Sequence, residues 1–271
     1  MLEQTIEYLV SWFVYPNLLW NQLLLSIGLS TAFAAVWLTP YWTPILKKPW
    51  AWAILAGGGF LSVLAVTFIQ IPLQAWTGHA LLHFWSQAVL MRWLLLAGIP
   101  QMLLSGLVQE GSKLVPVIIY WRQNGKNIDP KLGLVIGAVA GLGLGVFEAV
   151  WTHNQVFASG WTLSRVQLYG PLALAVFWER FFVIAFHTAV SALAGWGLAK
   201  GWGWQFYLLA SMLHGLTNYA IILLQAGIMN DVQIELFIAV IAVLVTTAAL
   251  WLRWRKTTEP VELAADAAES G

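Results

Sequence analysis

GLVIGAVAGLGLGVFEAV, residues 133–150, is the stretch that decides how this chain folds. It stays free of charged side chains until Glu148, and with its flanks it reaches the length of about 20 mostly apolar residues that a membrane-spanning helix needs. Gly137, Gly141 and Gly145 recur at every fourth position. Such a stripe of small residues lets two membrane helices approach closely. The stretch therefore predicts a helix that crosses a bilayer and packs tightly against a neighbour.

The composition of the whole chain agrees with a membrane protein. Of its 271 residues, 60% are hydrophobic and only 9% are charged, whereas a soluble domain carries about 25% charged residues. The 18 Trp residues favour a membrane–water interface. A net charge of +1 gives no reason to expect a nucleic-acid partner, and the absence of Cys excludes disulfides, thiolate metal sites and Cys nucleophiles. We therefore expect an integral membrane protein surrounded by the lipid bilayer.

Seven segments of the sequence are long and apolar enough to span a bilayer. The third is too long for one perpendicular helix, and residues 98–100 (Gly-Ile-Pro) are expected to break it into an interfacial helix and a span from Gln101 to Trp121. Residues 2–16 are expected to form another helix in the interface. The predicted spans are residues 18–38, 51–71, 87–121, 131–153, 168–199, 204–226 and 232–254.

These segments predict an all-α fold, a polytopic transmembrane helical bundle of about seven spans. No internal repeat and no linker divides residues 1–256, which we expect to form a single transmembrane domain. The short, acidic and Ala-rich tail at residues 257–271 is expected to be disordered and cytoplasmic. The N-terminal segment lacks the basic region of a cleaved signal peptide, so none is expected.

The Lys and Arg residues are distributed unevenly between the loops of this bundle. With seven spans, one set of loops carries nine basic residues, and the opposite set carries Arg165 and few others. Basic loops stay in the cytoplasm. We therefore predict an N-terminus outside and a C-terminus in the cytoplasm, in a bacterial plasma membrane. The nine basic residues are Lys47, Lys48, Arg122, Lys126, Lys131, Lys200, Arg253, Arg255 and Lys256.

Several ionisable side chains fall inside the predicted spans, where a charge at the bilayer centre costs about 2.5–3.5 kcal/mol on insertion scales. They are expected to face the bundle interior and to pair with one another. Glu110 and Lys113 are three residues apart and share a helix face, which an ion pair within one helix would explain. Arg180 and His187 are seven apart, two turns along one face. The full set is Glu110, Lys113, Glu148, Glu179, Arg180, His187 and His214.

Three of these side chains share a depth in the membrane. Glu110, His187 and His214 each lie near the middle of a predicted span, so antiparallel helices could bring them together near the midplane, whereas Glu148 lies nearer the outer end of its span. His214 and Asn218 are four residues apart on one helix face. Each residue alone is explained equally well by a packing role, but the shared depth and spacing favour a site.

The remaining His residues are expected near the outer surface. His79 and His83 are four residues apart but lack the HExxH pattern of a zinc protease, so we interpret them as an exposed pair. His153 lies at the outer end of the fourth predicted span and is expected at the interface.

Four segments resemble the motifs of the PrsW family of membrane proteases, which is grouped with the CAAX prenyl proteases and their bacterial relatives. Each motif is weak alone, but their order and spacing agree across about residues 100–225. QEGSK at 109–113 resembles a Glu-Glu-x-x-Lys motif, GLGLGVFEAV at 141–150 a Gly-rich helix ending in Phe and Glu, ERFFVIAFHTAVSALAG at 179–195 an Arg-to-His helix, and HGLTN at 214–218 a His-x-x-x-Asn motif.

The resemblance implies an intramembrane peptidase that hydrolyses a peptide bond of a membrane-protein or peptide substrate. It implies that Glu110 activates water as the general base, that His187 positions the water or carries the proton, and that His214 and Asn218 polarise the carbonyl group. Glu148 would assist as a second carboxylate or as an orienting group. The supporting residues are Gln109, Lys113, Glu179 and Arg180.

The cofactor and two competing functions stay open at this point. His187, His214 and one Glu could make a three-ligand zinc site, but a metal-free mechanism uses the same residues and is slightly favoured because no local motif holds two ligands. Gln109 and Ala149, where the family pattern has Glu and Asn, favour a non-catalytic scaffold subunit. Intramembrane Glu, His and Arg also mark ion paths, although a small-solute or proton-coupled transporter often carries a repeat that this chain lacks.

Overall fold

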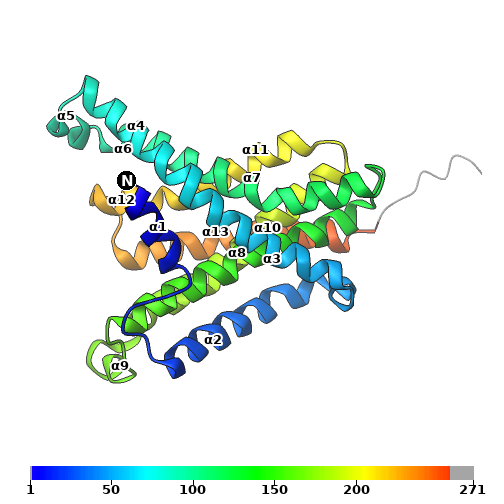
Figure 1. Cartoon of the computed structure of the whole chain (residues 1–271), viewed down its shortest axis with the longest axis horizontal. Coiled ribbons are helices and arrows are strands. Elements are labelled where there is room, and N and C mark those ends of the chain that lie inside the picture. The colour runs from blue at the N-terminus through cyan, green and yellow to red at the C-terminus, as the bar shows by residue number, and fades with distance from the viewer. Residues whose placement is uncertain (1, 257–271) are drawn as a thin grey trace, which may run out of the picture.

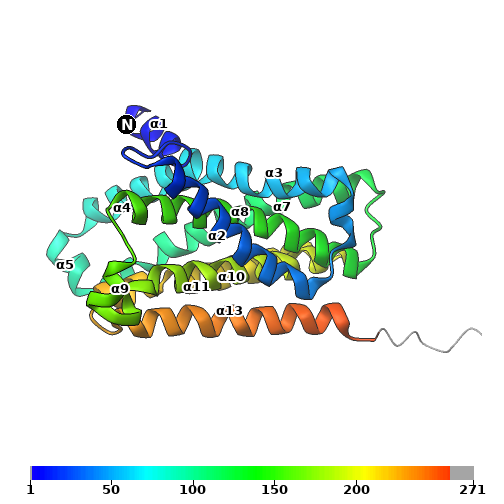
Figure 2. The same ribbon diagram turned by 90° about the horizontal axis from the view of Figure 1, so that it is seen from below.

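The structure, a computed structural model, describes residues 2–256, and the predicted tail at 257–271 lies outside this range. Every regular element within the described residues is a helix, and seven of the helical segments are long and apolar enough to cross a membrane. The long helices lie side by side, with the N-terminal helix α1 (Leu2–Ser11) at one end of the bundle and the C-terminal end of α13 (Asp231–Trp254) at the other (Figures 1 and 2). The prediction of an all-α bundle with seven spans is confirmed.

Each span corresponds to one segment predicted from the sequence, although several bounds differ. Several spans contain more than one helix. The second joins α3 (Pro49–Ala65), η3 (Val66–Gln70) and α4 (Ile71–Phe84), and the sixth joins α11 (Gly203–Asn218) and α12 (Ala220–Gln225). The long helices of the others are α2 (Trp20–Leu38), α7 (Ile99–Gln123), α8 (Pro130–Ala158), α10 (Ala175–Ala199) and α13. Short helices connect them: η1 (Thr39–Tyr41), η2 (Pro44–Lys47), α5 (Gln87–Arg92), α6 (Leu94–Ala97), α9 (Ser164–Tyr169) and η4 (Gly170–Leu174).

The second span is longer than predicted. Its predicted end at residue 71 is wrong, because the chain stays helical through Pro72 to Phe84. A proline has no N–H to donate to the preceding turn, and directly before Pro72 the hydrogen bonding changes from α to π over the five residues of η3. The change of pattern accommodates the missing bond. His79 and His83 therefore lie on α4 rather than in a loop, and both are exposed, as predicted.

The long helices of the third and fifth spans begin where their sequences carry a helix breaker. α7 begins at Ile99 with Pro100 in its first turn, and the turn at Gly98 separates it from α6, although both helices belong to one candidate span from Leu94 to Gln123. The fifth span was predicted from residue 168. The candidate span in the structure runs from Ser164 to Ala199 and includes that start, but its long helix α10 begins only at Ala175, after Gly170 with a φ of +67° and after η4.

Two helices, α8 and α10, form the centre of the bundle and are the most deeply buried of the spans. The predicted glycine stripe of α8 lies directly against α10. A Cβ atom on Gly137 or Gly141 would overlap the backbone carbonyl oxygen of Ser191 or His187. The two backbones are therefore nearly in contact, which small residues permit, and the same contact fixes the height of His187 relative to α8.

The other spans surround this central pair. α2 and α3 pack on α8, α13 packs on α10, and α7 pairs with α11. In Figure 2, α3 and α13 lie on opposite sides of the bundle. The pairing of α7 with α11 is also close, because a Cβ atom on Gly106 would overlap the backbone of Ser211. Glu110 lies one turn beyond Gly106, and His214 lies one turn beyond Ser211. Because α7 and α11 run in opposite directions, the two residues lie on either side of the contact, and their side chains reach across it toward one another.

His153 is buried, and its predicted position at the interface is wrong. α8 continues for five residues beyond His153, to Ala158, so the side chain lies within the helix and not at its end. It faces α2, where its Nδ1 lies 3.1 Å from the Oγ of Ser30. Its ring also packs on Phe177. A longer helix than the sequence suggested explains the difference.

The orientation of the bundle is a prediction that thiol labelling checks. The chain has no Cys, so single Cys residues can be introduced without removing others. Lys126, Lys200 and Ser159 are all exposed, so the side of the membrane, and not burial, will decide their reactivity. In intact cells, Cys at 126 or 200 should be protected from an impermeant maleimide, and Cys at 159 should react. The opposite pattern would reverse the predicted orientation.

Candidate functional site

Glu110 lies on α7 and is completely buried. Its Oε1 accepts a hydrogen bond from the Nζ of Lys113 at 2.6 Å and lies 2.6 Å from the Nδ1 of His214 on α11. The Oγ of Ser191 on α10 lies 3.5 Å from its other oxygen. The ion pair with Lys113 agrees with the spacing of three residues seen in the sequence. Three helices therefore converge on one carboxylate.

His187 of α10 connects this carboxylate to a second one. Its Nδ1 lies 3.1 Å from the Nζ of Lys113, and its Nε2 lies 2.9 Å from an oxygen of Glu148 on α8. An ammonium group can only donate, so Nδ1 accepts from Lys113 and the N–H at Nε2 donates to Glu148. The hydrogen bonds thus fix both the ring orientation and the tautomer of His187.

Arg180 compensates the charge of Glu148. The guanidinium lies two turns before His187 on the same face of α10, as predicted, and its Nη1 is 3.6 Å from an oxygen of Glu148. Arg180 also forms an ion pair with Glu179. Acidic and basic side chains therefore alternate across the site, which is how buried charges are tolerated inside a membrane protein.

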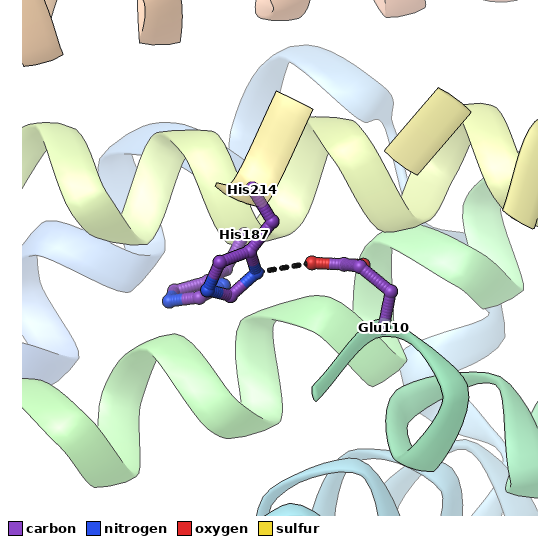
Figure 3. A group of neighbouring side chains, drawn as sticks. All are labelled: Glu110, His187 and His214. Carbon is purple, nitrogen blue, oxygen red and sulfur yellow. Dashed lines mark hydrogen bonds and ion pairs between the residues drawn. The ribbon is translucent and has the colours of Figure 1, made fainter. Parts of the chain in front are cut away.

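Glu110, His187 and His214 form the candidate metal-binding cluster (Figure 3). One ligand atom from each residue lies within 4.8 Å of the other two, and all three side chains are buried. The imidazole rings of His187 and His214 are 5.1 Å apart between centroids. Each residue comes from a different helix, α7, α10 or α11. We refer to these three residues as the Glu/His cluster.

The donor set of the Glu/His cluster fits a zinc ion. Two imidazole nitrogens and one carboxylate oxygen are the protein ligands of many catalytic zinc sites, which keep a further position open. In such sites the second nitrogen of a His ligand usually donates to a carboxylate, as the Nε2 of His187 does to Glu148. The ammonium of Lys113 contacts two of the three residues, so a cation held by the same three residues would have to displace it.

One cavity adjoins the Glu/His cluster, and a second lies beyond Glu148 and Asn218. The smaller, of about 150 Å³, lies beside His187 and His214 and reaches α13. The larger, of about 270 Å³, lies between η3, α7 and α8 and reaches α1 and α12. Glu148 and Asn218 line both cavities, whereas Glu110 lines neither. The site is therefore a buried polar centre with space on one side of it.

Two of the predicted site residues lie beside the cluster and not within it. Asn218 donates from its Nδ2 to the Oγ of Ser105 at 2.6 Å. Gln109 donates to the Oε1 of Gln70 at 3.1 Å and to Ser105 at 3.4 Å. Gln109 stands where the family motif has Glu, but it is not one of the three residues of the Glu/His cluster. The departure therefore removes none of the possible metal ligands. Ala149, the other departure, is buried in the hydrophobic core.

The uncharged polar residues that line the larger cavity were not predicted from the sequence. Gln70 and Ser105 carry no charge, so they do not belong to the ionisable residues from which the site was predicted. A signal was present, because Gln70 and Gln74 are four residues apart on one helix face, and Gln101, Ser105 and Gln109 repeat the same spacing on the next span. A stripe of uncharged polar residues at helical spacing would have indicated the cavity.

Comparison with known proteins identifies one family. Residues 47–250 match the model of the PrsW family intramembrane metalloprotease. The match covers well over half of the chain, from η2 into α13, and includes the region of about residues 100–225 that carries the four motifs. No curated protein and no solved structure is detectably similar to the chain.

Proposed function

Because the chain belongs to the PrsW family of intramembrane metalloproteases, we propose that it hydrolyses a peptide bond of a membrane-protein substrate at the Glu/His cluster. The convergence of one carboxylate and two imidazoles from three helices within 4.8 Å supports this proposal. Amide hydrolysis needs an activated water, donors for the developing oxyanion and a proton for the leaving amine. The side chains around the two cavities offer a group for each need.

Zinc is the cofactor that we propose. Glu110, His187 and His214 would hold the ion, whose Lewis acidity would act on a peptide carbonyl and on water. The sequence slightly favoured a metal-free mechanism because no local motif holds two ligands. A local motif is not needed here, because the three possible metal ligands come from three separate helices. Glu148 supports the arrangement by binding Nε2 of His187, which leaves Nδ1 directed into the cluster.

Glu148 is the carboxylate that we propose for proton transfer. A general base must reach the water that it deprotonates. The Glu148 side chain is 25% exposed and lines both cavities. The Glu110 side chain is fully buried and is held by Lys113 and His214. We therefore assign Glu110 to holding the cluster, in place of the role of base that the family resemblance implied.

Asn218 is the group that we propose for binding the substrate carbonyl. It lines the smaller cavity, at the side of the cluster where Glu148 lies. The side-chain N–H of Asn218 donates to Ser105 in the free protein. On substrate binding, it would exchange this hydrogen bond for one to the carbonyl oxygen, where a negative charge develops.

Zinc content is the first test of this proposal. Purified protein should contain about one zinc ion per chain by elemental mass spectrometry, as expected for a three-ligand catalytic site. His187→Ala or His214→Ala should remove it, because each deletes one of the three donors. Removal of the zinc with a chelator should stop cleavage of a co-reconstituted single-span protein, and added zinc should restore it.

The exposed His pair on α4 provides the matched control. His79→Ala and His83→Ala delete imidazoles far from the cluster in sequence and exposed at the surface, so both variants should retain zinc. A zinc-free protein that still cleaves would overturn the metal assignment and would return Glu110 to the role of general base. A zinc-loaded protein that never cleaves, in any membrane substrate tested, would favour the scaffold reading.

A further inference from the structure

The polar lining of the larger cavity indicates the conformation in which a substrate binds, an inference that rests on the proposed function. We propose that this cavity binds a short unwound segment of the substrate's membrane helix, whose freed peptide groups form hydrogen bonds with the side-chain amides and hydroxyl on its wall. The polar wall consists of Gln70, Gln74, Ser105, Gln109, Glu148 and Asn218.

The chemistry of the wall matches neutral peptide groups. Carboxamides offer both a donor and an acceptor, as a peptide group does. An ion would be bound better by several charged side chains, whereas Glu148 is the single charged residue among those that line the cavity. Within the described residues, the Oε1 of Gln109 and the Oδ1 of Asn218 accept no hydrogen bond, while the N–H groups of both side chains are engaged. Acceptors for backbone N–H groups are therefore available at two neighbouring points.

The physical need for such a wall arises from the membrane itself. Inside a bilayer every backbone N–H and C=O must be satisfied, and a helix satisfies them internally. A peptide bond in an intact helix is shielded by its own turn. To expose it the substrate must open that turn and free several polar groups, each costly in an apolar medium. Amide side chains at the wall would replace the lost hydrogen bonds.

The position of the cavity suits this role. It shares Glu148, Asn218 and Ile221 with the smaller cavity beside the Glu/His cluster, so the two spaces are adjacent. Its volume of about 270 Å³ lies below the usual range for ligand pockets, about 300–1,000 Å³. An α-helix with its side chains is about 10–12 Å across. A few extended residues would fit where an intact helix would not.

The N-terminal helix forms part of the wall of the larger cavity. Tyr8 of α1 and Trp12, which follows α1, line it, and Trp12 stacks on Trp151 of α8 with the ring centroids 4.6 Å apart. α1 itself lies against η3, the π-helical turn that ends at Gln70. A crosslinking group at position 12 would therefore report what occupies this space.

Photo-crosslinking tests binding without requiring turnover. The probes are two biotinylated Leu-Ala transmembrane peptides, one with a central Gly-Pro pair that weakens its helix. The photo-reactive amino acid p-benzoylphenylalanine replaces Trp12, and in the control it replaces Leu244, an exposed residue of α13. At position 12 the Gly-Pro peptide should be labelled in clear excess over the uninterrupted peptide. Equal labelling of both peptides, or labelling no stronger than at position 244, would overturn the proposal.

Kinetics provide a second, independent readout. Gln70→Met with Gln109→Met keeps side-chain length but removes the amides, and should raise KM for a cleaved substrate about tenfold with little change in kcat. Gln155→Met, a similar change outside the cavity lining, should leave KM unchanged. An unchanged KM in the double variant would overturn the proposal. Absence of any cleavage would count against the proposed function, while the crosslinking result would still decide the binding site.

Discussion

Replacement of Glu110 by Gln is expected to lower turnover of a membrane substrate by a factor of about 100 or more. The carboxamide has nearly the same shape, and its oxygen can still accept from Lys113 and His214. It carries no charge, however, so it would hold a zinc ion poorly. His214→Asn, which removes another of the three donors, should have a similar effect. Reporter cleavage per mole of purified, reconstituted protein measures both.

The Glu110→Gln substitution also has a cost in stability that must be separated from catalysis. It leaves Lys113, whose side chain is fully buried, without its partner at 2.6 Å, and breaking a buried pair costs about 3–5 kcal/mol. The double variant Glu110→Gln with Lys113→Met removes both charges. It should regain much of the lost stability and should still fail to cleave. Recovery of turnover by the double variant would remove Glu110 from the reaction.

Glu235→Gln is the matched control for this substitution. Glu235 is also a carboxylate within a membrane span, on α13, but it lines neither of the two cavities. Its replacement by Gln should therefore leave turnover close to the wild-type value. If Glu110→Gln and Glu235→Gln lower turnover equally, loss of charge in the bundle, and not loss of the cluster, is the cause.

Gly141→Leu is expected to abolish folding of the bundle. A Cβ atom at this position would overlap the carbonyl oxygen of His187 and would lie 2.7 Å from the side chain of Ser191. The overlapped atom belongs to the backbone, so no rotamer change relieves it, and α8 must separate from α10. We expect a loss of about 4 kcal/mol or more, at the extreme of single-residue effects. Chromatography of the detergent-solubilised protein and its thermal unfolding measure the change.

Gly28 provides the control for this second prediction. It lies on α2, where a Cβ atom would meet nothing within 4 Å, so Gly28→Leu should behave as the wild type does. A Gly141→Leu protein that unfolds at the wild-type temperature would show that the close contact between α8 and α10 is not needed. The distance between Glu148 and His187 depends on the same contact, so zinc binding should be lost together with the fold.

The membrane-spanning segments of the fold were predictable because the lipid bilayer restricts their length and composition. A span must be apolar and about 20 residues long, so all seven were found, and the glycine stripe of α8 indicated a close neighbour. The errors concern the ends of helices that continue beyond their predicted bounds. The second span was predicted to end at residue 71, but the π-helical turn before Pro72 let the helix continue to Phe84. His153 was misplaced because α8 runs beyond the predicted span.

The candidate site was predictable only in part. Helical periodicity placed Glu110 beside Lys113 and put Arg180 on the face of His187, and both relations hold in the structure. Periodicity within one helix cannot give the rotation of one helix against another. It therefore left open that Glu148 binds His187 and that Gln109 faces Gln70. Those pairs depend on packing between spans that are distant in sequence.

The assignment of this chain as a peptidase is tested most sharply by mapping new protein termini. Purified protein is reconstituted with a single-span substrate, and the fragments are identified by terminal labelling and mass spectrometry. Wild-type protein should generate termini within or beside the apolar segment of the substrate. The Glu110→Gln, Lys113→Met double variant, at equal amount and equally folded, should generate none. Identical termini in both samples, or none in either, would contradict proteolysis at the Glu/His cluster.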